Sequence, residues 1–269
     1  DNLYTNEKEL NGQEGVDDDG NGLIDDIYGF NFIHSNGKIY PDDVSHGTHV
    51  AGTVAARNNN GIGVGGIAGG DGTPGSGIRL MSAQIFGGKN ENGNSTRALI
   101  YSANNGAVIS QNSWGYRYEA QITTLPQSLK AAIDYFIKYA GCDNDGNQLP
   151  NSPMKGGVVI FAAGNDGREY NSLPAAYDPV VAVASMAPDW KSAWYSNRGL
   201  WVDITAPGGD QYYAQGEVLS TLSKSITGQE YGYMQGTSMA CPHVSGVAAL
   251  IVSHFGKKGF TNTECKQRL

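Results

Sequence analysis

The chain has 269 residues, a formal net charge of −8 and 38 glycines, about twice the usual glycine share of ~7%. Its 39% hydrophobic content excludes a disordered chain and predicts a sizeable buried core. The acidic balance argues against a nucleic-acid-binding protein, whose binding surface is usually basic. The longest apolar runs are too short to span a bilayer, so no transmembrane segment is expected.

Short β-rich segments alternate with helical ones along the chain. Strands are expected at 78–85, 107–110, 158–162 and 180–184, and helices at 95–105, after Pro126 and at 244–251. Ser95 or Thr96 is the expected N-cap of the first of these helices. The strands 158–162 and 180–184 are almost continuously apolar, which indicates a parallel sheet covered on both faces. Functional residues in such a fold sit at the carboxyl ends of the strands.

An acidic segment lies near the start of the chain, with five aspartates between positions 17 and 26. The pattern from Asp17 to Asp25 reads D-x-D-x-N-G-x-x-D, which resembles a calcium loop with a glycine turn at its sixth position. The alternative is a solvated acidic turn. We expect Ca²⁺ to be bound by the side chains of Asp17, Asp19, Asn21 and Asp25, by the carbonyl of Leu23, and by Asp26 in place of the absent bidentate glutamate.

Three further segments each place a polar side chain where a strand or turn meets a helix. The first is Ser45-His46-Gly47-Thr48-His49, in which Ser45 is the expected polar cap of a helix. The second is Phe161-Ala162-Ala163-Gly164-Asn165, at the end of a buried strand. The third is Gly236-Thr237-Ser238-Met239-Ala240, a tight turn that leads into an apolar helix. A serine hydrolase needs a serine, a base within hydrogen-bond reach and a donor aimed at the oxyanion. The three segments contain a serine, a histidine and an asparagine, which are residue types that can fill these roles.

In this order, and together with Asn112-Ser113-Trp114-Gly115, the segments resemble the subtilisin-like serine proteases (subtilases, peptidase S8 type). The resemblance implies an α/β fold: a three-layer αβα sandwich with a mostly parallel central sheet. It also implies a single catalytic domain over residues 1–269, incomplete at both ends. A lipase of the α/β-hydrolase type is excluded by chain order, because its histidine follows the serine.

The resemblance assigns roles to individual residues. Ser238 would be the nucleophile, His46 the general base, and Asn165 the side-chain donor to the oxyanion; His49 would be structural and buried. The substrate-binding walls would come from Ser113, Trp114, Gly115, Ala163, Gly164 and Ser172. The loop Asn58–Val64 partly matches a calcium loop of the family.

One family element has no counterpart in this sequence. The family's catalytic aspartate precedes the histidine in an Asp-Thr-Gly or Asp-Ser-Gly motif on a strand, and residues 1–45 contain no such motif. Asp42 and Asp43 are too close to His46 in sequence to serve. The expectation is therefore that the chain begins downstream of that aspartate, that it is a very weak protease, and that the missing strand leaves an unpaired edge inside the sheet.

The sequence thus predicts a serine endopeptidase that acts on protein or peptide substrates through an acyl-enzyme on Ser238. The alternative is a non-catalytic, calcium-dependent binding module on a subtilase scaffold, which the absent aspartate would favour. Family membership further implies a propeptide that has been removed and a secreted or cell-envelope location, where millimolar calcium suits such loops.

Overall fold

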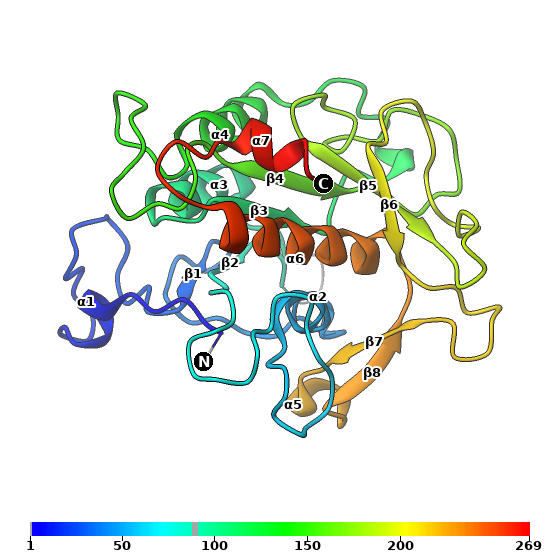
Figure 1. Cartoon of the computed structure of the whole chain (residues 1–269), viewed down its shortest axis with the longest axis horizontal. Coiled ribbons are helices and arrows are strands. Elements are labelled where there is room, and N and C mark those ends of the chain that lie inside the picture. The colour runs from blue at the N-terminus through cyan, green and yellow to red at the C-terminus, as the bar shows by residue number, and fades with distance from the viewer. Residues whose placement is uncertain (1, 88–90) are drawn as a thin grey trace.

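The computed structural model describes residues 2–87 and 91–269. Helices and strands alternate along most of the chain (Figure 1). In chain order the elements are α1 (Glu7–Leu10), β1 (Gly29–Asn31), α2 (His46–Ala55), β2 (Ser82–Gln84), α3 (Ser95–Asn104), β3 (Ile109–Asn112), the 3₁₀ helix η2 (Tyr118–Ala120), α4 (Gln127–Tyr139), β4 (Val158–Ala162), β5 (Val181–Met186), β6 (Ile204–Pro207), β7 (Val218–Thr221), α5 (Lys224–Thr227), β8 (Tyr231–Met234), α6 (Thr237–Phe255) and α7 (Asn262–Lys266).

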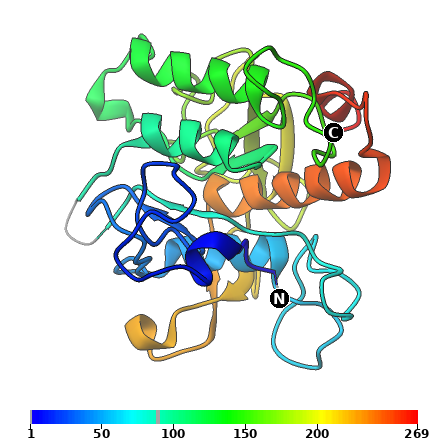
Figure 2. The same ribbon diagram turned by 90° about the vertical axis from the view of Figure 1, so that its left-hand side faces the viewer.

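A parallel sheet of order β3-β4-β5-β6 forms the middle layer of the molecule. Successive side chains of a strand point to opposite faces, and β4 shows this directly. Val158 and Ile160 pack in one core cluster with α6, whereas Val159 and Phe161 pack in a second cluster with α3 and α4. Helices α6 and α7 therefore cover one face and α3 and α4 the other (Figure 1, Figure 2). The predicted three-layer αβα architecture is confirmed.

Two smaller sheets stand apart from this layer. Strands β1 and β2 form a parallel pair, and β7 and β8 form an antiparallel hairpin that packs on α2. In the part of the chain that the structure describes, β2 has no strand partner besides β1, and β3 has none besides β4. The expected strand 78–85 is shorter in the structure: β2 covers residues 82–84, and Leu80 forms an isolated parallel bridge with Leu3.

The caps of two helices differ from the prediction. Ser45 precedes α2 with a left-handed φ of 61°, but its hydroxyl accepts a hydrogen bond from Ser223 N instead of capping the helix. The cap of α2 is the carboxylate of Asp42, as described below. The cap of α3 is Asn94, whose side chain accepts from Arg97 N, so the expectation of Ser95 or Thr96 was wrong by one or two residues.

Helix α6 is long and apolar enough, by length and composition, to cross a membrane. More than half of its apolar window is buried inside the protein, where it packs against β3, β4, β5 and β6. Core helices of globular proteins meet the same criterion, so this helix is weak evidence for a membrane span. Its first turn carries Ser238.

Candidate active site

Three of the predicted segments meet at the carboxyl ends of adjacent strands. Ser113 follows β3, Asn165 follows β4, and Ser238 lies in the first turn of α6. The hydroxyl of Ser113 donates to Ser238 O at 2.7 Å, and the hydroxyl of Ser238 donates to Ser113 O at 3.3 Å. This reciprocal pair ties the start of α6 to the end of β3.

The side chain of Asn165 is fixed by Thr237. Both the backbone N–H and the hydroxyl of Thr237 donate to Asn165 Oδ1, each at 2.8 Å, and the same hydroxyl accepts from Gly164 N at 3.0 Å. Because its oxygen is held in this way, the amide nitrogen of Asn165 is left to serve as a donor elsewhere.

That nitrogen and the backbone N–H of Ser238 border the same space. A methyl group placed on Gly236 would lie 3.4 Å from Asn165 Nδ2 and 3.6 Å from Ser238 N. Gly236 has a φ of 150° and no side chain, so it leaves this space open. Asn165 Nδ2 and Ser238 N therefore lie close together beside the Ser238 side chain, and an oxyanion requires two such donors.

Two residues that hold this arrangement were missed at the sequence level. Thr237 lies in the Gly236–Ala240 segment, but the sequence assigned no separate role to it. Asn197 carried no sequence signal, yet it is fully buried, donates from Nδ2 to Ala163 O at 3.1 Å and accepts at Oδ1 from Asp166 N at 3.0 Å. It fixes the loop after β4 that presents Asn165.

The predicted pocket-wall residues lie on the loops that follow β3 and β4, and both loops contact the segment that contains Ser172 and Leu173. A methyl group on Gly115 would meet Leu173 O at 3.2 Å, and one on Gly164 would meet Ser172 Oγ at 3.1 Å. Ser172 itself is buried. Ser113, Gly115, Ala163, Gly164 and Ser172 therefore lie on the loops after β3 and β4 or on the segment packed against them.

Trp114 is oriented toward the core. Its ring packs edge-on against Phe161 at a centroid distance of 5.1 Å, and its Nε1 donates to Asn112 Oδ1 at 3.1 Å. The ring thus joins the apolar layer between the sheet and α3 and α4.

His46 is the first residue of α2, which packs against α6. Burial lowers the pKa of His46 below the ordinary value of 6.5, and the charge of Asp42 opposes this shift. The carboxylate of Asp42 accepts from the backbone N–H of His46 at 2.8 Å and of Gly47 at 3.2 Å, so it caps α2. Among residues 2–87 and 91–269, the His46 ring has no carboxylate hydrogen-bonded to it and no hydrogen bond to Ser238.

His49 lies one helical turn further on and is fully buried. Its Nε2 lies 3.0 Å from Val218 O and 3.2 Å from Gly232 O, so it connects α2 to the β7–β8 hairpin. This is the structural position that the family resemblance implied.

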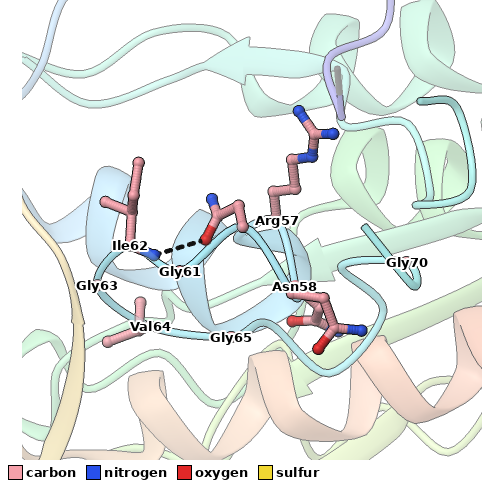
Figure 3. Close-up of a pocket in the computed structure, with 10 residues that line it drawn as sticks. Arg57, Asn58, Gly61, Ile62, Gly63, Val64, Gly65 and Gly70 are labelled. Atoms are coloured by element: carbon pink, nitrogen blue, oxygen red, sulfur yellow. Dashed lines mark hydrogen bonds between the residues drawn. The ribbon is translucent and has the colours of Figure 1, made fainter. Parts of the chain in front are cut away.

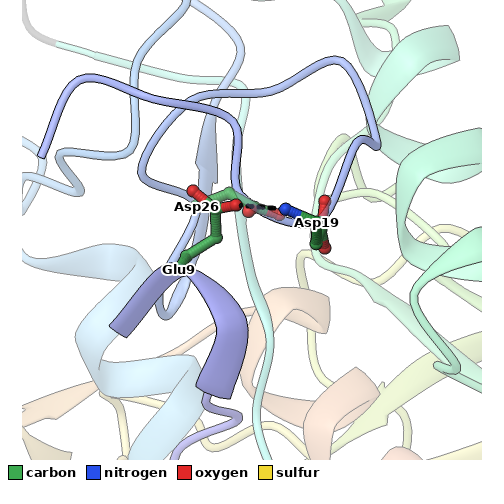
Figure 4. A group of neighbouring side chains, drawn as sticks. All are labelled: Glu9, Asp19 and Asp26. Carbon is green, nitrogen blue, oxygen red and sulfur yellow. Dashed lines mark hydrogen bonds between the residues drawn. The ribbon is translucent and has the colours of Figure 1, made fainter. Parts of the chain in front are cut away.

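The acidic segment folds around a side chain from α1. Carboxylate oxygens of Glu9, Asp19 and Asp26 lie within 4.8 Å of one another (Figure 4). Glu9 accepts from the backbone N–H groups of Asp18 and Asp25 at 2.7 and 2.9 Å, and it is almost fully buried. Sequence reasoning missed Glu9 because it lies outside the loop motif, and only the folded chain brings it close.

The other predicted calcium ligands use their oxygens locally. Asp17 accepts from the N–H groups of Gly20 and Gly22, and Asp25 accepts from Gly15 N. Asn21 Oδ1 accepts from Leu23 N, and the Leu23 side chain is buried beside Phe30 and Phe32. Of the six predicted residues, the structure therefore gathers the carboxylates of only Asp19 and Asp26 at one point, together with Glu9.

Asp26 is the most constrained of the three carboxylates. It is fully buried and accepts from Tyr101 Oη at 2.7 Å and from Asn6 Nδ2 at 3.0 Å. Burial raises the pKa of Asp26, its hydrogen bonds lower it, and the nearby charge of Asp19 raises it further, with a net increase. A bound cation would offset this cost, so the oxygen-only donor set fits a hard cation such as Ca²⁺.

The Asn58–Val64 loop lines a separate surface cavity of about 400 Å³ (Figure 3). Its lining includes the cationic side chain of Arg57, and Asn60 Oδ1 accepts from Ile62 N at 3.0 Å. None of its lining residues carries a carboxylate. The charge of this loop therefore gives no support to a second cation site.

Comparison with known proteins is consistent with this geometry. The Subtilase family (Peptidase_S8) matches residues 16–269. The chain is 35% identical over 244 residues to a thermophilic serine proteinase of Bacillus sp. strain AK1, covering 90% of this chain and 50% of that protein. It is 32% identical over 240 residues to the major intracellular serine protease of Bacillus subtilis, covering 85% of this chain and 62% of that protein.

Solved structures show the same likeness. A protease from Pseudoalteromonas arctica superposes with a TM-score of 0.66 at 31% identity, covering 87% of this chain and 69% of that one. A cold-adapted subtilisin-like serine proteinase, at 24% identity and a TM-score of 0.62, shares the fold, with 89% of this chain and 71% of that one covered. The chain belongs to the subtilase family of serine proteases. It spans about half the length of the curated relatives that it matches.

Proposed function

We propose that the chain is the catalytic part of a serine endopeptidase in which Ser238 attacks the peptide carbonyl. The observation that carries this proposal is the pair of donors, Asn165 Nδ2 and Ser238 N, that border one open position beside the Ser238 side chain. Such preorganised donors stabilise the negative charge that develops on the carbonyl oxygen.

His46 is the residue that would take the proton from Ser238. Its lowered pKa keeps the ring neutral, which a general base requires. The Ser238 hydroxyl now donates to Ser113 O, so the hydroxyl has to rotate toward His46 before attack. Hydrogen bonds of this kind often tighten only when substrate binds.

The activity of the chain alone is expected to be low. In the subtilisin mechanism an aspartate holds the histidine in its tautomer and stabilises the imidazolium, and its loss costs about 3 × 10⁴ in kcat. His46 has no such partner among the described residues. Substrate binding would use the loops after β3 and β4, on which Ser113 and Gly164 lie.

Hydrolysis of an internally quenched peptide library tests the proposal. We expect slow cleavage by the wild-type chain and none by Ser238→Ala. Ser245→Ala is the matched control, because Ser245 also lies in α6 but its hydroxyl donates to Cys241 O outside the site. Cleavage that survives in Ser238→Ala would refute the assignment of the nucleophile.

A calcium-dependent binding module without catalysis is the second candidate, favoured because no carboxylate among the described residues is hydrogen-bonded to the His46 ring. It predicts calcium-dependent capture of protein ligands with no turnover at any enzyme concentration. Turnover that is lost in Ser238→Ala would exclude it.

We also propose that Glu9, Asp19 and Asp26 hold a structural Ca²⁺ ion. The support is the close approach of their oxygens and the burial of Asp26. Calorimetric titration with CaCl₂ should give a binding isotherm for the wild type that disappears in Asp19→Ala and weakens in Glu9→Gln. Asp145→Asn, an exposed change in another loop, should leave it unaltered. Identical isotherms for all four proteins would refute the site.

Secretion or attachment to the cell envelope, and activation by removal of a propeptide, follow as proposals from the family alone. Extracellular calcium at millimolar levels would saturate a loop of moderate affinity. Detection of a larger precursor and a mature form in culture medium would support both.

A further inference from the structure

The chain contains six Asn-Gly steps, with the asparagine at positions 11, 21, 36, 60, 92 and 105, and all six lie in the described part of the chain. In such a step the backbone nitrogen of the glycine can attack the side-chain carbonyl carbon of the asparagine, which makes asparagine a thermolabile residue. Glycine favours this attack because no side chain shields its nitrogen. The attack needs a nitrogen without other bonds and a backbone that can move, so the fold decides which step reacts.

Four of these six steps are protected because the glycine nitrogen already donates a hydrogen bond. The donor–acceptor distances lie between 2.7 and 3.3 Å, and the pairs are Gly12 N with Glu9 O, Gly22 N with Asp17 Oδ2, Gly93 N with Ile85 O, and Gly106 N with Ala103 O. Attack on the neighbouring asparagine would first have to break this bond, and that cost slows the reaction.

The step at Asn36 is protected by its surroundings. Asn31 N donates to Asn36 O at 2.9 Å, and Asn31 Nδ2 donates to Lys38 O at 3.0 Å, so the chain on both sides of Gly37 is tied to β1. A methyl group placed on Gly37 would overlap the backbone carbonyl of Asp25. The backbone of Gly37 therefore has little room to swing its nitrogen toward the side chain of Asn36.

The step at Asn60 has neither kind of protection. Asn60 and Gly61 are both exposed, and a methyl group placed on Gly61 would have no atom within 4 Å. Among the described residues, nothing accepts a hydrogen bond from Gly61 N. The carbonyl oxygen of the Asn60 side chain accepts from Ile62 N at 3.0 Å (dashed line to Ile62 in Figure 3). That bond polarises the carbonyl group and makes its carbon more open to attack.

The charge around Asn60 also favours an acidic product. Asn60 and Arg57 line the same surface cavity, and none of the residues that line it carries a carboxylate. Conversion of the amide to an acid would place a negative charge in the cavity that contains the guanidinium group. The formal net charge of the chain would change from −8 to −9.

We propose that Asn60 is a site of spontaneous deamidation, at which attack by the backbone nitrogen of Gly61 converts the asparagine to isoaspartate and aspartate. This modification is independent of the proposed catalytic function, since it needs only the loop and water.

The reaction takes place in two steps. In the first step a bond forms between Gly61 N and Asn60 Cγ, the bond from Cγ to Nδ2 breaks, and ammonia leaves with the proton of Gly61 N. In the second step solvent water opens the resulting succinimide ring. Opening at Cγ gives aspartate, and opening at the backbone carbonyl of residue 60 gives isoaspartate. Nothing is oxidised or reduced.

Peptide mapping by mass spectrometry tests the proposal, in Ser238→Ala so that the chain is not lost to self-cleavage. The protein is incubated at mildly alkaline pH, and trypsin then releases residues 58–79, which contain one Asn-Gly step. We expect deamidation at Asn60 to be at least fivefold faster than at the other five steps, the factor that one extra hydrogen bond to break corresponds to. Electron-transfer fragmentation should identify isoaspartate together with aspartate.

Two controls separate the effect of the fold from that of the local sequence. In concentrated urea the six steps should react at similar rates, because the protecting contacts are lost. In the folded protein, Asn60→Gln should remove the fast phase of deamidation, since a glutamine would have to form a larger ring, whereas Asn36→Gln should leave that phase unchanged. Circular dichroism checks that both variants fold.

Three results would overturn the proposal. The first is deamidation of another Asn-Gly step ahead of Asn60 in the folded protein. The second is an Asn60 that reacts in urea and stays unchanged in the folded protein. The third is a product at residue 60 that is aspartate alone, because attack by Gly61 N gives isoaspartate as well.

Discussion

The serine side and the histidine side of the candidate site are built differently. Ser238 and Asn165 lie at the ends of a continuous sheet and are tied together by hydrogen bonds through Ser113 and Thr237. His46 lines the cavity that β2, β3 and α2 border, and in the described part of the chain no carboxylate is hydrogen-bonded to its ring.

The difference shows which parts of a catalytic site are positioned by strand pairing and hydrogen bonds within the chain. Where strands pair, as β3, β4 and β5 do, loop ends are placed by the register and need only a few side chains to lock them. His46, by contrast, is held by the helix α2, and no carboxylate among the described residues is hydrogen-bonded to its ring. The serine side is therefore expected to be preorganised, and the histidine side to be limiting.

The largest effect on the serine side should come from Asn165→Ala. Removing one side-chain donor to an oxyanion typically costs about 10²–10³ in kcat. The measurement is kcat for peptide cleavage, and KM should change little. Asn151→Ala, an exposed change elsewhere, is the control. A loss below threefold would show that Asn165 does not face the reacting carbonyl.

A smaller effect is expected from Thr237→Val. This change removes the hydroxyl that donates to Asn165 and accepts from Gly164 N, while the backbone bond from residue 237 to Asn165 remains. One hydrogen bond of about 1 kcal/mol corresponds to roughly a fivefold loss in kcat. Thr237→Ser keeps the hydroxyl and should recover most of the rate. Equal rates for the valine and serine variants would refute this positioning role.

The buried histidines should make the free energy of unfolding depend on pH. Burial lowers the pKa of His46, His49 and His243 below 6.5 in the folded state. The unfolded chain therefore binds more protons as pH falls below 6.5. The stability contribution is fully present above that pH and is lost as pH falls through the lowered folded-state values.

Urea unfolding between pH 7.5 and 5 measures this effect directly. We expect the free energy of unfolding to fall with pH, and His49→Gln to reduce the slope, because His49 is the fully buried member of the three. A flat profile over this range would contradict the assignment of neutral, buried rings.

Much of the fold could be predicted from local sequence. The apolar runs 158–162 and 180–184 coincide closely with β4 and β5, because a strand buried on both faces must be apolar throughout. The helix expected after Pro126 is α4, and its buried face contains Leu129, Ile133 and Phe136.

The contacts that could not be predicted from the sequence join residues that are far apart in the chain. Glu9 joins the acidic cluster from a separate helix, and Asn197 reaches the loop of Asn165 from a position more than thirty residues along the chain. Asp42 displaced Ser45 as the cap of α2 because Ser45 adopts a left-handed conformation and bonds to Ser223. No local pattern encodes such contacts.

The central claim is that Ser238 is the nucleophile, supported by His46 and by the donors of Asn165 and Ser238. Mass spectrometry of the chain after treatment with a fluorophosphonate probe tests it most directly. The account predicts a single adduct on the peptide that contains Ser238, formed more slowly in His46→Ala and absent in Ser238→Ala. An adduct on another serine, or no adduct after prolonged treatment of the chain, would contradict it.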